Sequence, residues 1–153
     1  MSVKIRMVTL QDTDEVEKIM QQVQALHVTW RPDIYKPIDR MIDEEYIQRH
    51  IDNETCYVAT IDEKVVGVFE IQYRHIKTPV HVTRDVIFID TMAVDEKYRK
   101  QGIGTAFLEK VKELRTLKKL DGIELQVNAR NEAAYAMYEK AGFTPKSINM
   151  ELI

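Results

Sequence analysis

The sequence predicts a mixed α/β fold, in which a mixed β-sheet is flanked by helices. Apolar residues recur at helical spacing in some segments and form short β-branched or continuously apolar runs in others. A tight turn joins the first two strands after the early helices, whereas helices separate the later strands, so both antiparallel and parallel pairs are expected. No Gly/Ser-rich linker interrupts the chain, and we expect one domain, residues 1–153.

The N-terminal part predicts one strand and two helices. Residues 3–8 are a short β-branched run, which is typical of a strand. The segment 9–12 (Thr-Leu-Gln-Asp) has the form of a capping box, and the helical spacing that follows predicts a helix to about His27. Pro32 ends this pattern, because proline disfavours helical backbone at the residue before it. Apolar residues on a polar background predict a second helix over residues 42–51.

The middle of the chain predicts three strands. Residues 55–61 and 64–74 are expected to form a hairpin with a tight turn at residues 62–63. Residues 75–85 have little apolar pattern and are expected to be a loop or a ragged strand extension. Residues 86–94 are almost continuously apolar, as expected of a central strand that is covered on both faces.

The C-terminal part alternates helices and strands. It predicts a helix over residues 102–120, a strand over 123–127, a helix over 131–141 ended by Gly142, and a last strand or hairpin over 143–153. The long helix is expected to bury an apolar face made of Ile103, Phe107, Val111, Leu114 and Leu117.

Composition restricts the class of function. There are 22 Lys and Arg against 25 Asp and Glu, and the resulting net charge of −3 argues against a nucleic-acid partner, whose binding needs a basic face. No apolar run approaches the ~20 residues of a membrane span, and the start lacks the apolar stretch of a signal peptide. We therefore expect a cytoplasmic protein without a membrane partner. The only cysteine, Cys56, lies in an apolar run and is expected to serve packing.

The most informative segment is residues 92–105, in which an apolar strand ends, a short polar loop follows and two glycines begin a long helix. The first amides of a helix have no internal partner and lie at the positive end of its dipole. Gly102 and Gly104 leave room for a phosphate to approach these amides, while Arg99 and Lys100 add positive charge. The segment therefore predicts a loop that binds a pyrophosphate.

Two other phosphate-binding loops do not fit this sequence. A dinucleotide fingerprint needs a third glycine, where this chain has Phe107. A Walker A loop needs Gly-Lys followed by Ser or Thr, which the sequence lacks. Both absences disfavour a nucleotide-binding domain.

Residues 99–104 (R-x-x-G-x-G) resemble the [Gln/Arg]-x-x-Gly-x-[Gly/Ala] signature of the GNAT superfamily of acyl-CoA N-acyltransferases. Downstream, residues 131–143 (N-x-x-A-x-x-x-Y-x-x-x-G-F) resemble the second block of that superfamily. The order of the expected elements agrees with the superfamily over residues 3–153. The two blocks in this order are a much more specific signal than either block alone.

The resemblance implies a GNAT fold, a central and mostly antiparallel sheet with a V-shaped splay between two parallel strands, here residues 86–94 and 123–127. It also implies acetyl-CoA as the co-substrate, with its pantetheine arm lying in the wedge along the first of these strands. The residues implied to hold it are Met92, Ala93, Val94, Arg99, Lys100, Gln101, Gly102, Ile103, Gly104, Thr105, Asn131 and Tyr138.

The implied reaction is direct attack of a neutral amine on the thioester in a ternary complex. It needs a proton acceptor for the amine, a donor to the oxyanion and an acid for the departing thiolate. The amide of Ala93 or Val94 is expected to be the oxyanion donor, and the resemblance implies that Tyr138 is the acid.

Three alternatives remain for the base. Asp90 lies in the middle of an apolar run, two residues before Met92 and therefore on the same expected face of the strand. Glu70 lies in the middle of the strand before it. A chain of water molecules without a single base is the third alternative.

In the superfamily, the connection between the first two helices forms much of the amine pocket, and here it holds His27, Trp30 and Tyr35. The acceptor stays open between a small-molecule amine and a protein amine, and the superfamily implies a homodimer. Four scattered histidines without cysteine partners argue against a metal site. The alternative function is a catalytically inactive acyl-CoA-binding sensor or regulatory module, against which the complete motifs and Tyr138 argue.

Overall fold

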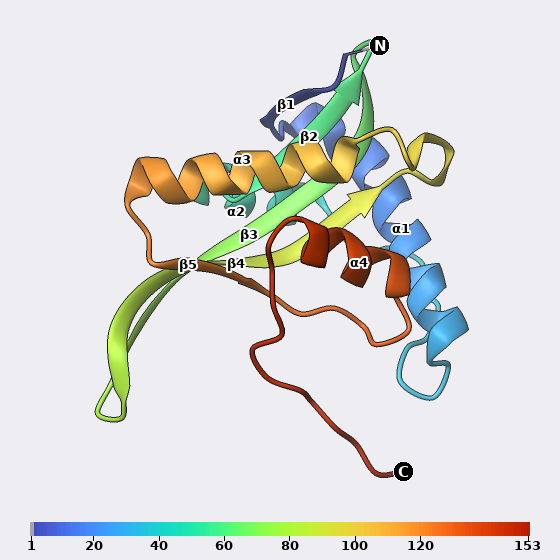
Figure 1. Ribbon diagram of the computed structural model, residues 1–153. Coiled ribbons are helices and arrows are strands. Elements are labelled where there is room, and N and C mark those ends of the chain that lie inside the picture. Colours follow the sequence, from blue (N-terminus) through green and yellow to red (C-terminus); the bar gives the residue numbers. More distant parts are fainter. Residues whose placement is uncertain (1) are drawn as a thin grey trace.

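The computed structural model describes residues 2–153, and its elements follow the expected order as far as the last helix (Figure 1). This confirms the mixed α/β class. The elements are β1 (Lys4–Met7), η1 (Leu10–Asp12), α1 (Thr13–Trp30), α2 (Glu44–Asn53), β2 (Cys56–Ile61), β3 (Lys64–Thr78), β4 (His81–Val94), η2 (Glu96–Tyr98), α3 (Ile103–Lys118), β5 (Gly122–Leu125) and α4 (Glu132–Lys140), where η marks a 3₁₀ helix.

The strands form one sheet in the order β1-β2-β3-β4-β5. The first four strands pair antiparallel with one another. Tight turns join β2 to β3 and β3 to β4, whereas α1 and α2 lie between β1 and β2. β4 and β5 pair in parallel, because α3 carries the chain back across the sheet between them. Their pairing is short and runs only from Val86–Gly122 to Ile89–Leu125.

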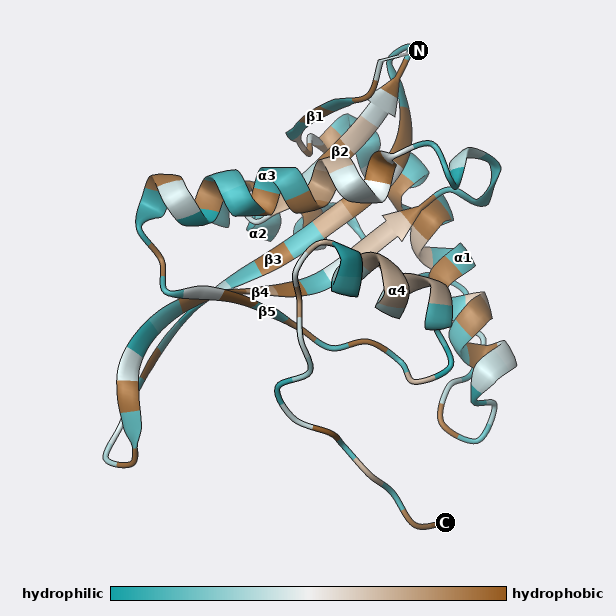
Figure 2. Cartoon of the chain, in the orientation of Figure 1, coloured by the Kyte–Doolittle hydropathy of each residue, from teal (hydrophilic) through white to brown (hydrophobic). Residues whose placement is uncertain are grey.

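Helices cover both faces of this sheet, and each face has its own apolar core. On one face α3 packs through Phe107 against Phe69 and Ile87, all of them buried. On the other face α1 and α2 pack through residues such as Val16 and Ile47. Apolar and polar segments alternate along α3 in Figure 2, which is the pattern of a helix with one buried side.

One expected core position of α3 is wrong. Four of its five predicted apolar residues are buried, but Leu117 is 73% exposed. It lies in the last turn of α3, beyond the part of the helix that the sheet covers.

The hairpin between β2 and β3 has the expected tight turn. Asp62 and Glu63 both adopt left-handed backbone, with φ of 50° and 66°. Two successive left-handed residues are the geometry of a two-residue hairpin turn whose twist matches that of the strands.

The segment 75–85 is a strand extension, and the loop interpretation is wrong. β3 and β4 continue their pairing through His75–Asp85 to Thr78–His81, so the two strands form a long hairpin arm beyond the rest of the sheet (Figure 1). The weak apolar pattern misled the prediction, because this arm is solvent-exposed and does not need an apolar face.

The N-terminal capping pattern is present in the structure. The Asp12 carboxylate accepts hydrogen bonds from the backbone N–H of Thr9 at 2.8 Å and from its hydroxyl at 3.1 Å. α1 extends to Trp30, one turn beyond the predicted end at His27. Cys56 is buried, as its apolar surroundings predicted, and burial raises the pKa of its thiol.

The C-terminal predictions are partly wrong. The last helix is capped by Ala141, and Gly142 follows in left-handed backbone with φ of 104°, as expected of a helix end. β5 ends at Leu125, two residues before the predicted end at Val127. Within the described residues, the segment 143–153 contains no strand. A strand needs a neighbour to pair with, and neither segment has one here.

We expect Phe107→Ala to lower the free energy of unfolding by about 3–5 kcal/mol, because it removes a buried aromatic ring and leaves a cavity between α3 and the sheet. The matched control Leu117→Ala, at an exposed position in the last turn of the same helix, should change it by less than about 0.5 kcal/mol. Urea unfolding followed by circular dichroism measures both values. Equal losses in the two variants would contradict the packing of α3.

Candidate active site

β4 separates from β5 near the middle of the sheet, and this separation forms a wedge between the two strands. Their pairing stops at Ile89 and Leu125, although β4 continues to Val94. Over residues 90–94, β4 therefore has a partner strand only on its β3 side.

The register shows which backbone groups of β4 face the wedge. Asp95 donates its N–H to the Val66 carbonyl at 2.8 Å, and hydrogen-bonded residues alternate along an antiparallel pair. Ala93 consequently directs its backbone groups toward β3. Met92 and Val94 direct theirs to the opposite edge, into the wedge.

The loop before α3 exposes backbone amides beside this wedge. Lys100 and Gly102 adopt left-handed backbone, with φ of 63° and 81°, and α3 begins at Ile103. Ala106 makes the first helical bond, to the Gly102 carbonyl, so the amides of the preceding helical residues have no partner within the helix. A Cβ added at Gly102 would meet nothing within 4 Å. The site is thus open enough for an anion.

The sequence pattern suggested that Gly104 leaves room for a phosphate, but the structure gives this glycine a packing role. A Cβ at this position would lie 2.7 Å from Sδ of Met137 and 3.7 Å from Cε of Met92. The missing side chain therefore lets α3 and α4 pack closely at the wedge. The other predicted loop residues, Arg99, Lys100, Gln101 and Thr105, are exposed around the helix start.

α4 contributes the two remaining residues predicted to bind the coenzyme. Tyr138 is half-buried, its ring centroid lies 5.9 Å from that of Phe143, and burial raises the pKa of its hydroxyl. Asn131 is the N-cap of α4, where its side-chain oxygen accepts a hydrogen bond from the Ala134 N–H at 3.2 Å. Asn131 therefore has a structural role that its sequence position alone did not reveal.

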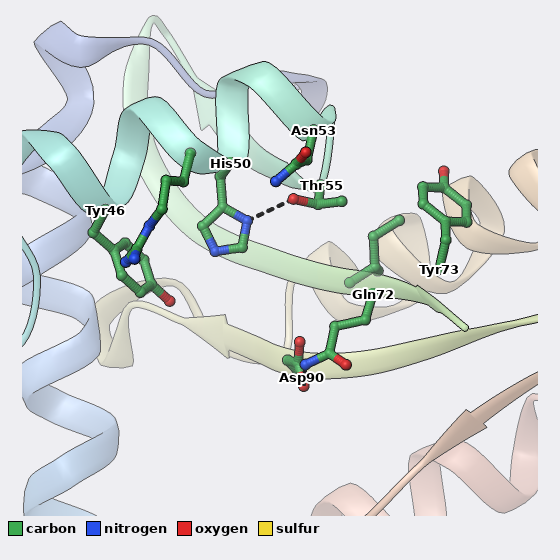
Figure 3. A pocket seen from close by; sticks show the side chains of 9 residues that line it. Tyr46, His50, Asn53, Thr55, Gln72, Tyr73 and Asp90 are labelled. Carbon is green, nitrogen blue, oxygen red and sulfur yellow. Dashed lines mark hydrogen bonds between the residues drawn. The ribbon is translucent and has the colours of Figure 1, made fainter. Parts of the chain in front are cut away.

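A cleft of about 620 Å³ lies on the opposite face of the sheet, between α2 and strands β3 and β4 (Figure 3). In Figure 3, His50 and Tyr46 extend from α2 toward the sheet, while Gln72 and Asp90 come from the strands. The cleft is lined by Tyr46, Arg49, His50, Asn53, Thr55, Ile71, Gln72, Tyr73 and Asp90.

Glu70 lies beneath this cleft and is only 2% exposed. Its Oε2 accepts a hydrogen bond from the Tyr46 hydroxyl at 2.7 Å and lies 3.2 Å from Nε2 of His50. The other ring nitrogen of His50 is 2.7 Å from the Thr55 hydroxyl. Burial and the neighbouring carboxylate raise the pKa of Tyr46, so its hydroxyl keeps the proton that it donates. A buried carboxylate with such partners is held in one position.

Asp90 is exposed, and it lies on a different face from the one predicted. β3 pairs Glu70 with Thr91 but Ile71 with Ile89, so Asp90 is the extra residue of a β-bulge. Such a residue shifts the alternation of the side chains that follow it. Asp90 consequently points into the α2-side cleft, where it accepts a hydrogen bond from Gln72 at 3.0 Å, while Met92 packs in the α3-side core. The prediction that the two share a face is wrong.

The predicted acceptor residues form a separate cluster at the end of α1. The ring centroid of His27 lies 5.9 Å from that of Trp30 and 4.7 Å from that of Tyr35. Burial lowers the pKa of His27, which favours its neutral form. None of the three is among the residues that line the 620 Å³ cleft.

Sequence reasoning missed Tyr46 and His50. A signal was present, because the two residues are four apart on a predicted helix and so share one side of it. Only the fold reveals that this side lies over Glu70.

A sequence model described as "Acetyltransferase (GNAT) family" matches residues 20–143. The chain belongs to this family. The match confirms the resemblance given by the two sequence blocks, and it fits the exposed amides at the wedge.

Known proteins support the same assignment. Streptothricin acetyltransferase of Escherichia coli is 27% identical over 99 residues, which are 65% of this chain and 52% of that protein. The [ribosomal protein bS18]-alanine N-acetyltransferase of Escherichia coli K12 is 36% identical over 67 residues, 44% of this chain and 45% of the relative. The chain thus spans about half the length of these curated relatives.

The x-ray structure of a tetramutant of the BH1408 protein from Bacillus halodurans matches over 98% of this chain and 99% of its own, with a TM-score of 0.86 and 29% identity. This agreement confirms the GNAT fold.

Two further observations concern other classes of site. None of the helices formed by residues 2–153 has the length and apolar character needed to cross a membrane. Within the same residues, no cluster of three or more His, Cys, Asp or Glu is arranged to hold a metal ion.

Proposed function

We propose that the protein is an acetyl-CoA-dependent N-acetyltransferase, in which an amine attacks the thioester directly in a ternary complex. The observation that carries the proposal is the set of open amides at the start of α3, beside the wedge where β4 leaves β5. The wedge lies between the two faces of the sheet. It is therefore accessible both to a coenzyme held at α3 and to an amine in the cleft under α2.

The residues at the wedge fit a coenzyme arm and its diphosphate. The amides of the α3 start and the side chains of Arg99 and Lys100 are suited to the diphosphate. The wedge-facing backbone groups of Met92 and Val94 are suited to amides of the pantetheine arm, which would lie along β4 like an added strand.

Acetyl-CoA supplies the activated acetyl group, and the chain must position it and move protons. The Val94 N–H faces the wedge, whereas that of Ala93 is directed toward β3, so we assign the oxyanion donor to Val94. We assign the acid to Tyr138 of α4, whose burial raises the pKa of its hydroxyl, so that it keeps its proton at neutral pH, as an acid for the leaving thiolate must.

The two carboxylates of the cleft suit different tasks. Asp90 is exposed at the bulge and can attract a cationic amine. Glu70 is buried and firmly held, and it can accept the proton of the amine through a water molecule. We therefore assign amine binding to Asp90 and the role of base to Glu70.

The acceptor class is proposed as a small cationic amine, because the cleft is enclosed by α2 and two strands and has an exposed carboxylate. Two relatives argue in different directions, since one is a streptothricin acetyltransferase and the other a ribosomal-protein alanine N-acetyltransferase. The resemblance also implied a homodimer, which stays a prediction.

The direct test is isothermal calorimetry with acetyl-CoA, followed by an amine screen with free-thiol detection. Binding together with amine-dependent thiol release is the expected result. Binding without release for any amine would favour the sensor alternative. No binding by folded protein would refute the proposal.

We expect Thr105→Glu to raise the Kd for acetyl-CoA at least about tenfold, or about 1.4 kcal/mol. The substitution puts an anion in the diphosphate site, yet a carboxylate in the first helical turn does not disfavour the helix. Thr116→Glu, an exposed position near the far end of α3, is the matched control and should bind normally. Equal affinity in both variants would contradict the site.

We expect Tyr138→Phe to lower kcat by about 10²–10⁴-fold, the usual contribution of a general acid, with little change in the KM for acetyl-CoA. Tyr135→Phe changes an exposed tyrosine of the same helix and should keep full activity. Steady-state kinetics with an acceptor from the screen measures both. A fully active Tyr138→Phe enzyme would refute the acid role and show that Tyr138 serves only packing.

Glu70→Gln and Asp90→Asn separate the two carboxylates. Loss of the base in Glu70→Gln should lower kcat by about 10²-fold or more, with little change in the KM for the acceptor. Asp90→Asn should mainly raise the KM for the acceptor. A loss of kcat in Asp90→Asn together with a raised acceptor KM in Glu70→Gln would assign the base to Asp90 and amine binding to Glu70. Unchanged kinetics in both variants would support a chain of water molecules.

A further inference from the structure

Two charges of opposite sign line the α2-side cleft without pairing with each other. Arg49 belongs to α2, and Asp90 lies on the strand side of the cleft (Figure 3). Within residues 2–153, neither side chain takes part in an ion pair, although Asp90 accepts a hydrogen bond from Gln72. Both charges are therefore available to a ligand that carries a positive and a negative group.

Tyr46 separates the acidic part of the cleft from the basic part. Its hydroxyl donates to the buried Glu70 at 2.7 Å, whereas the guanidinium carbon of Arg49 lies 5.8 Å from the centroid of its ring. Tyr46 and Arg49 are three residues apart on α2 and so lie on the same side of the helix. The guanidinium is thus held beside the tyrosine ring, while the carboxylate lies at its hydroxyl end.

A second hollow, of about 380 Å³, adjoins the cleft and adds positive charge on the Arg49 side. It is lined by Arg40, Met41, Ile42, Asp43, Tyr46 and Arg49, and it shares the last two with the cleft. The carboxylate of Asp43 is engaged as the N-cap of α2, where it accepts the Tyr46 N–H at 2.8 Å. Arg40 has only a long ion pair, at 3.7 Å, with the exposed Asp14. Two guanidinium groups against one carboxylate leave this hollow net positive.

We infer that the acceptor is a small amine that also carries an anionic group, a carboxylate or a phosphate, and that Arg49 binds this group. The inference rests on the proposed function and narrows its acceptor class. The amine end lies toward Glu70 and Asp90, and the anion lies where the two hollows meet. A guanidinium binds either anion through two parallel hydrogen bonds. A diamine would instead place its second cation beside Arg49 and Arg40, which repel it.

The test compares acceptors that differ in the charge of the distal group. 4-Aminobutyrate and 6-aminohexanoate are assayed against their amides, and 2-aminoethyl phosphate against ethanolamine, with acetyl-CoA and free-thiol detection. At least one anionic acceptor should exceed its neutral counterpart in kcat/KM by about tenfold or more. The pair that responds distinguishes a carboxylate from a phosphate and gives the spacing from the amine.

Arg49→Gln should abolish this preference. It should lower kcat/KM for the anionic acceptor about tenfold, mainly through KM, and leave the neutral counterpart unchanged. Arg49→Lys keeps the charge and should keep part of the preference. Lys77→Gln removes one positive charge at an exposed position of the hairpin arm, outside both hollows, and is the matched control. Equal losses for both acceptors in Arg49→Gln would overturn the inference, because Arg49 would then only support the cleft.

Calorimetry on protein loaded with coenzyme A separates this inference from the proposed function. Anionic and neutral amines that are acetylated equally well would overturn the inference and leave the transferase standing. If no amine releases thiol, the transferase fails, and the binding comparison decides about the anion site. Binding of an anionic amine that Arg49→Gln loses, with its neutral counterpart bound more weakly by the wild type, would support the site. Equal binding of the two, or binding of neither, would overturn it.

Discussion

A single extra residue in β4 sets the arrangement of the whole site. The bulge at Asp90 interrupts the register with β3, and the pairing of β4 with β5 ends one residue earlier, at Ile89. A bulge bends its strand and increases the local twist, which can direct the rest of β4 away from β5. The wedge, the wedge-facing backbone groups of Met92 and Val94, and the position of Asp90 over the cleft all depend on this local irregularity.

The two sides of the wedge present different chemical groups, backbone amides on one side and side chains on the other. On the α3 side the proposed binding groups are backbone amides, whose positions are fixed by the helix start and by left-handed residues such as Gly102. On the α2 side they are side chains, held by a buried network around Glu70. Burying that carboxylate has a free-energy cost, which the hydrogen bond from Tyr46 and the close contact with His50 offset. The same bonds join α2 to β3, so the network also supports the fold.

Much of the fold could be predicted from the sequence because helical spacing, apolar runs and the turn at residues 62–63 are local signals. The exposed amides at Gly102 were predictable for the same reason. The face of Asp90 was not, because a bulge is produced by pairing between strands and leaves no mark in one strand. The contacts of Tyr46 and His50 with Glu70 could not be predicted either, because they depend on the packing of α2 over β3. The strand or hairpin predicted at residues 143–153 is absent because a strand needs a neighbouring strand to pair with, and this segment pairs with none in the structure.

In the proposed function, the separation of β4 from β5 would give the site two entrances, one from each layer of helices. A bulky donor that arrives from the α3 layer does not block the path of an acceptor that arrives from the α2 layer. Under that proposal neither reactant would need to wait for the other to bind, and the spent thiol and the acylated product would depart by separate routes. An order of addition, where one is found, would reflect a change in the chain's conformation and not an obstructed passage.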